Sequence, residues 1–148
     1  MEDFVYACIQ LIHNVGAAAV VGIPTVAWWL MSSSRVATEL TDRTISIQAI
    51  PRRLAWLTLL AWSTQIASGI TFGLTTYYLK HELPELTGVA FTALAIKVGC
   101  AIICCTLTLL YLLKGTRWIE SFQLIAWKTL FALGLASLMS AAFLRWFG

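Results

Sequence analysis

The stretch IHNVGAAAVVGIP, at positions 12–24, decides the fold of this chain. It lies inside a segment from Phe4 to Met31 that contains no Asp, Glu, Lys or Arg, so that His13 is the only basic side chain in it. A helix crosses a bilayer with about 20 apolar residues, because each residue advances it by about 1.5 Å. An imidazole in hydrocarbon is costly and usually has a partner or a task. The segment therefore predicts a transmembrane helix that carries a polar site.

Composition extends this interpretation to the whole chain. Of its 148 residues, 59% are hydrophobic and 11% are charged, and the mean hydropathy is +0.81. A soluble domain has about 25% charged residues. The sequence contains no patch of mixed basic and aromatic residues that would indicate nucleic-acid binding. We therefore expect contact with the lipid bilayer and no nucleic-acid partner.

Four long apolar segments predict an all-α protein, a single domain over residues 1–148. We expect an integral membrane four-helix transmembrane bundle with helices over 4–31, 54–79, 88–113 and 117–147. The links near residues 80–87 and 114–116 are short, so consecutive helices there are antiparallel neighbours. The segment 35–53 is the longest expected loop, and it leaves room for a short interfacial helix. Gly69 and Gly73 form a GxxxG pattern, which indicates close helix packing.

The distribution of basic residues predicts the orientation. The loop after the first helix and the loop before the fourth carry most of them, whereas Lys80 and Arg145 lie at the other side; the first group is Arg35, Arg43, Arg52, Arg53, Lys114 and Arg117. Loops rich in Lys and Arg stay in the cytoplasm. We expect a multi-pass protein of the plasma (inner) membrane of the cell with both termini outside.

His13 and Lys97 form the candidate site. Both lie about 9 residues beyond the outer ends of their helices, which puts both about 13 Å deep at 1.5 Å per residue. A lysine at that depth costs about 2.5–3.5 kcal/mol on insertion scales, so something must stabilise it. The alternatives to a functional pair are a structural histidine bonded across helices, and an ammonium bonded to backbone carbonyls or lipid headgroups.

Small or soft residues are expected at a similar level on the other helices. Gly16 and Gly99 lie next to the basic pair in sequence, and Ser68, Gly69 and Met139 lie at a comparable depth on the second and fourth helices. A basic pair among small residues suits a flat macrocycle with anionic propionates. This arrangement predicts a haem site.

The cysteines suggest a second kind of site. Lys97, Cys100 and Cys104 are spaced i, i+3 and i+7, so they share one helix face. Thiolate and thioether ligands suit Cu(I). Small buried thiols are the simpler interpretation of the same residues.

Short motifs resemble a known family. The residues Ile12-His13, Gly16-Ala17-Ala18 and Val21-Gly22 resemble the first-helix pattern of the copper resistance protein D family. Arg52-Arg53-Leu54, leading to Ser68-Gly69, resembles the second helix of that family, and Ala95-Ile96-Lys97 resembles its third.

The layout is also similar to that of the four-helix protoporphyrinogen oxidases. In those proteins a histidine in the first helix and a lysine in the third, here His13 and Lys97, are associated with haem. The two resemblances together imply a haem- or copper-linked membrane protein.

Three hypotheses follow. The first is a b-type haem protein with a redox or electron-transfer role, in which His13 is an axial ligand and either Met139 or Lys97 is the sixth ligand, or Lys97 neutralises a propionate. The second is copper transport or handling through His13, Met139, Cys100 and Cys104. The third is a cofactor-free accessory or assembly subunit of a larger membrane complex, and a homo-oligomer is also open. None of these assigns a catalytic residue.

The orientation is directly testable. Because Lys and Arg concentrate in the first and third loops, an epitope tag placed after Gly148 should be accessible from outside intact cells. A tag inserted in the first loop should be protected until the membrane is permeabilised. The reverse pattern would contradict the orientation.

Overall fold

Every described segment of the chain is helical. The computed structural model describes residues 2–37, 49–80 and 88–147. These form α1 (Glu2–Ala37), α2 (Ala49–Lys80), α3 (Val89–Lys114), the short 3₁₀ helix η1 (Gly115–Arg117) and α4 (Glu120–Phe147). Each α-helix contains a segment long and apolar enough to cross a membrane: Phe4–Ser33, Ile50–Tyr78, Val89–Lys114 and Glu120–Leu144. The all-α prediction with four such helices is confirmed.

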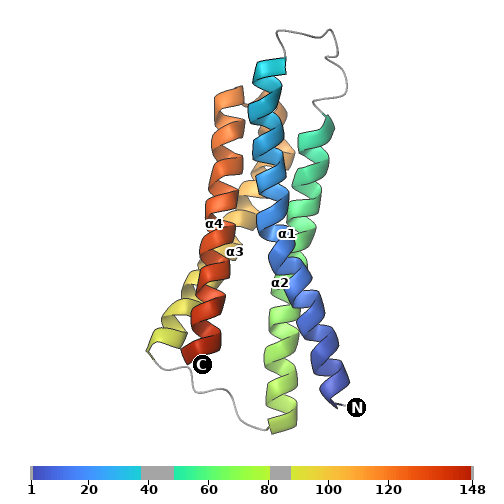
Figure 1. The fold of residues 1–148 in the computed structure, drawn as a ribbon, viewed down its shortest axis with the longest axis vertical. Helices are drawn as coiled ribbons and strands as arrows, with labels where there is room; N and C mark the ends of the chain where they lie inside the picture. Colours follow the sequence, from blue (N-terminus) through green and yellow to red (C-terminus); the bar gives the residue numbers. More distant parts are fainter. Residues whose placement is uncertain (1, 38–48, 81–87, 148) are drawn as a thin grey trace.

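The helices form an elongated four-membered bundle (Figure 1). α1 packs against α2 and α4, and α3 packs against the same two helices, so that α1 and α3 face each other across the diagonal. The chain ends lie at one end of the bundle and the turn between α3 and α4 lies at the other (Figure 1). The pair α1–α2 and the pair α3–α4 lean apart toward the end that carries the termini (Figure 1).

The predicted helix boundaries need two corrections. α1 and α2 extend beyond the expected limits at residues 31 and 54, so the connection between them shrinks to residues 38–48. The expected interfacial helix falls on that segment and lies outside the described residues. The fourth helix begins at Glu120 and not at Arg117. The chain instead forms η1 and then an extended residue, Trp118 (φ −81°, ψ 144°).

Gln123 explains the late start of α4. Its Nε2 donates to the carbonyl oxygens of Gly115 and Trp118, both at 3.0 Å. Its Oε1 accepts a hydrogen bond from the Tyr111 hydroxyl at 3.3 Å. The Gly115 carbonyl oxygen also accepts a hydrogen bond from the Trp118 N–H at 3.1 Å. Gln123 therefore ties the end of α3 to the first turn of α4 and fixes the break between them.

The best-buried part of the bundle lies around two tryptophans. Trp62 on α2 and Trp127 on α4 are fully buried, as is Leu130. The rings of Tyr111 and Trp127 meet edge to face at 5.2 Å, an arrangement that aromatic pairs prefer. Within this core the Tyr111–Trp127 contact joins α3 to α4.

Gly134, which is not part of the GxxxG pattern, lies close to the backbone of a neighbouring helix. A Cβ built on Gly134 of α4 would lie 2.7 Å from the carbonyl oxygen of Val20 on α1. Pro24 lies four residues after Val20 and has no N–H, so that carbonyl lacks its ordinary helical partner. The Cα hydrogen that stands in place of a side chain on Gly134 faces the carbonyl oxygen of Val20. Such Cα–H···O=C contacts are found where helices pack closely. Gly73, by contrast, has nothing within 4 Å of a built Cβ, so the GxxxG prediction is wrong for its second glycine.

The α1–α4 contact predicts a sharp difference between two glycine substitutions. Gly134→Ala should lower the free energy of unfolding by about 1–3 kcal/mol, because backbone atoms must move apart. Gly22→Ala is the matched control: its Cβ would meet nothing within 4 Å, and alanine is the better helix former by about 1 kcal/mol. Thermal or denaturant unfolding in mild detergent measures both. Equal stability of the two variants would contradict the close approach.

Candidate functional site

Four side chains from three helices meet inside the bundle. His13 comes from α1, Gln65 and Ser68 from α2, and Lys97 from α3; we call them the His13 cluster. Lys97 Nζ lies 3.0 Å from His13 Nε2, Gln65 Nε2 lies 3.1 Å from the same nitrogen, and Ser68 Oγ lies 2.9 Å from His13 Nδ1. The two residues expected at equal depth are therefore in direct contact. Their contact spans the diagonal between α1 and α3.

The hydrogen bonds select one form of the imidazole. The Ser68 hydroxyl donates its single proton to the carbonyl oxygen of Gln65 at 3.1 Å. Its oxygen therefore accepts from His13, which places the imidazole proton on Nδ1. Nε2 is left with a lone pair. A hydrogen bond at one ring nitrogen commonly fixes the tautomer in this way when the other nitrogen binds a ligand or accepts a proton.

Two N–H donors converge on that single lone pair. The Lys97 ammonium and the Gln65 amide both point to Nε2 of His13 at hydrogen-bond distance. One lone pair does not fully satisfy two donors. The acidic residues of the sequence lie at positions 2, 3, 39, 42, 82, 85 and 120, outside the central parts of all four helices. The cluster thus combines basic groups and N–H donors with no carboxylate from the middle of a helix.

Gln65 is the tightly buried member of the cluster. Its side chain is 6% exposed, and its Oε1 is a buried atom without a hydrogen-bond partner in the described part of the chain. A Cβ built on Gly16 would lie 2.7 Å from that oxygen. Gly16 is therefore the residue that lets the Gln65 amide fit between α1 and α2. A buried acceptor without a hydrogen bond lowers the stability of the fold, so the burial of this oxygen calls for a structural or functional explanation.

The structure places the remaining expected site residues differently. Gly69 borders the cluster, because a Cβ built on it would lie 4.0 Å from His13 Cε1. Gly99 has no neighbour within 4 Å of a built Cβ. Met139 is 58% exposed on α4 and is not brought into the cluster.

The cysteines of α3 belong to the packed core. Cys100 is 7% exposed and Cys104 is fully buried, and both lie among the core residues. Among residues 2–37, 49–80 and 88–147, no group of three or more His, Cys, Asp or Glu side chains is arranged to hold a metal ion.

The sequence argument singled out His13 and Lys97 but missed Gln65 and Ser68 as their partners. The available signal was their i, i+3 spacing, which puts two polar side chains on one face of an otherwise apolar helix. Counting depth along α2 identified the level of Ser68. The rotation of α2 about its axis was needed to show that both face α1.

Comparison with known proteins adds no relative: no family model, no curated protein and no solved structure matches the chain.

The hydrogen-bond pattern predicts the tautomer of His13. In a His81→Gln background, which leaves one labelled histidine, ¹⁵N NMR at neutral pH should show Nδ1 protonated and Nε2 unprotonated. Ser68→Ala should shift the population toward the other tautomer, because the acceptor for Nδ1–H is lost. Ser63→Ala is the control, since that hydroxyl donates to Leu59 on the exposed face of α2. A protonated Nε2 in the unmodified cluster would contradict the assignment.

Proposed function

We propose that this chain is a multi-pass protein of the plasma (inner) membrane that binds haem b at the His13 cluster and has a redox or electron-transfer role. The observation that carries the proposal is the convergence of His13 and Lys97 from diagonally opposed helices at 3.0 Å. An ionisable pair in the middle of apolar helices is a functional candidate by default.

Four apolar helices support the membrane part of the proposal. Large hydrophobic side chains cover the outer faces of all four helices; examples are Leu11, Ile70, Ile102 and Met139, each more than half exposed. A soluble monomer rarely exposes apolar surface on this scale. Lipid chains would cover these faces at no cost in hydration.

The donor set of the cluster fits haem in two respects. The Nε2 lone pair of His13 would be the group to ligate iron, and the contact of Ser68 with Nδ1 would keep the ring in the tautomer that ligation needs. Lys97 supplies a positive charge beside it, which suits an anionic propionate. Gly16 and Gly69, whose missing side chains border Gln65 and His13, keep the surroundings small.

The same contacts define what the chain itself does at such a site. Haem would supply one-electron chemistry at its iron when bound. Ser68 would hold the Nδ1 proton, so that the imidazole stays oriented. Lys97 and Gln65, which donate to Nε2, would release that nitrogen and turn their N–H groups to the acidic edge of the ligand. The exposed position of Met139 gives no support to a thioether ligand from the same chain.

Copper handling receives less support from the geometry. Cys100 and Cys104 lie in the core, and the ring nitrogens of His13 contact Gln65, Ser68 and Lys97 rather than a thiol. A role as a cofactor-free subunit of a larger complex stays a prediction, because it depends on partners outside the chain.

Absorption spectroscopy tests the haem proposal. Protein purified in mild detergent and supplied with haem should show a Soret band. His13→Ala should abolish the band or shift it strongly, because the axial bond is lost. Lys97→Ala should lower haem affinity about ten- to hundredfold, since a charge-assisted hydrogen bond is worth about 1.5–3 kcal/mol.

Two matched substitutions control for general effects. His81→Ala removes the other histidine of the chain. Lys128→Ala removes an exposed lysine that lies 5.6 Å from the centre of the Trp28 ring. Both should leave the spectrum unchanged. A well-folded, colourless protein that takes up no added haem would overturn the proposal, as would equal loss of haem in His13→Ala and His81→Ala.

A further inference from the structure

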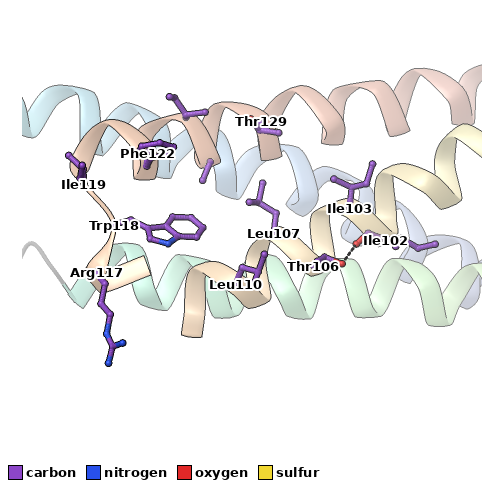
Figure 2. Close-up of a pocket in the computed structure, with 12 residues that line it drawn as sticks. Ile102, Ile103, Thr106, Leu107, Leu110, Arg117, Trp118, Ile119, Phe122 and Thr129 are labelled. Carbon is purple, nitrogen blue, oxygen red and sulfur yellow. Dashed lines mark hydrogen bonds between the residues drawn. The ribbon is translucent and has the colours of Figure 1, made fainter. Parts of the chain in front are cut away.

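An apolar groove lies between α3 and α4, away from the His13 cluster. It has a volume of about 860 Å³ and extends from Ile102 and Ile103, near the middle of α3, to Arg117 and Trp118 at the connection with α4. Figure 2 shows the Trp118 ring and Leu107 lying along this space, with Phe122 on α4 above it. Its walls are almost entirely hydrocarbon, so its occupant is apolar along most of its length.

The polar side chains of the groove are few. The hydroxyl of Thr106 already donates to the carbonyl oxygen of Ile102 at 2.8 Å. Thr129 is half-buried in the α4 wall. Arg117 is the charged lining residue, and its side chain extends away from the apolar walls (Figure 2). The groove therefore has a hydrocarbon body and a cationic end.

Arg117 lies between a basic and an acidic residue, Lys114 and Glu120, at the connection of α3 and α4. Lys114, three residues earlier, is also exposed. No lining residue is acidic; Glu120 begins α4 close by but is not part of the groove wall. A guanidinium pairs well with the two oxygens of a phosphate.

We propose that the α3–α4 groove binds an anionic glycerophospholipid, with an acyl chain along the apolar walls and the phosphate at Arg117. The inference rests on the membrane part of the proposed function and is independent of haem. The groove lies on the outer surface of two helices that are long and apolar enough to span the bilayer. A zwitterionic lipid carries its own ammonium beside the phosphate, which cancels much of the attraction to Arg117. An anionic headgroup retains the full attraction to Arg117. Basic sites between helices are known to select such lipids.

Quenching by brominated acyl chains measures occupancy of the groove. The full chain is reconstituted in vesicles that contain either brominated phosphatidylglycerol or brominated phosphatidylcholine. The fluorescence contributed by Trp118 is obtained as the difference between the wild-type chain and Trp118→Phe. Phosphatidylglycerol should quench it with an apparent affinity about fivefold higher, the size expected for one basic residue at a lipid surface.

Charge and shape are varied separately. Arg117→Gln should reduce the preference for phosphatidylglycerol to near unity. Arg52→Gln, which removes an exposed arginine on α2 outside the groove, should keep it. Thr129→Phe places a ring in the groove and should reduce quenching of Trp118 by both lipids. Circular dichroism of each variant verifies that the helices are intact.

Three results would overturn the proposal. Equal quenching by the two lipids would show that the headgroup is not recognised. Equal effects of Arg117→Gln and Arg52→Gln would show only general surface attraction. Absence of quenching together with a dimer by light scattering would assign the groove to a second copy of the chain. A protein that fails to float with vesicles would instead contradict the membrane part of the proposed function.

Discussion

The contact between His13 and Lys97 is the constraint on which the half of the bundle near the chain termini depends. Two basic side chains lie in apolar helices, and the central parts of these helices offer no carboxylate. Hydrocarbon cannot solvate them, so each must find partners within the bundle. The Ser68 oxygen accepts a hydrogen bond from the Nδ1–H of His13, and the Nε2 lone pair of His13 accepts one from Lys97. These hydrogen bonds fix the positions of α1, α2 and α3 relative to one another.

Small residues make the polar contact sterically feasible. Gly16 leaves the space that the Gln65 amide fills, and Gly134 lets α4 approach the carbonyl of Val20. Pro24 adds to the second contact, because it removes the N–H that would otherwise bind that carbonyl. In a bilayer, apolar side chains would gain little by leaving lipid for a helix interface, so packing at glycine and hydrogen bonding would carry more of the association than in a soluble bundle.

The two halves of the bundle differ in the side chains that fill their interior. The half with the chain termini contains the polar cluster, and there the two helix pairs lean apart (Figure 1). The half with the α3–α4 turn contains the buried rings of Trp62, Trp127 and Tyr111, and Gln123 closes its end. Buried polar atoms without a hydrogen-bond partner in the described part of the chain occur in both halves: Gln65 Oε1 in the first, and Trp62 Nε1, Thr108 Oγ1 and Trp127 Nε1 in the second. The α3–α4 groove lies on the packed half, outside the bundle interior.

The sequence alone determined the number of long helices and the level of the two basic residues. Both follow from counting, because hydrophobic length sets a span and 1.5 Å per residue sets a depth. Counting gives no rotation about the helix axis and no crossing of one helix over another. Met139 shared the expected level but lies 58% exposed, since the buried face of α4 runs through Trp127, Leu130 and Gly134. The partners of His13 were likewise decided by the tertiary structure, which turned Gln65 and Ser68 toward α1. The start of α4 was decided there too, because the amide of Gln123 binds carbonyls that precede it in the chain.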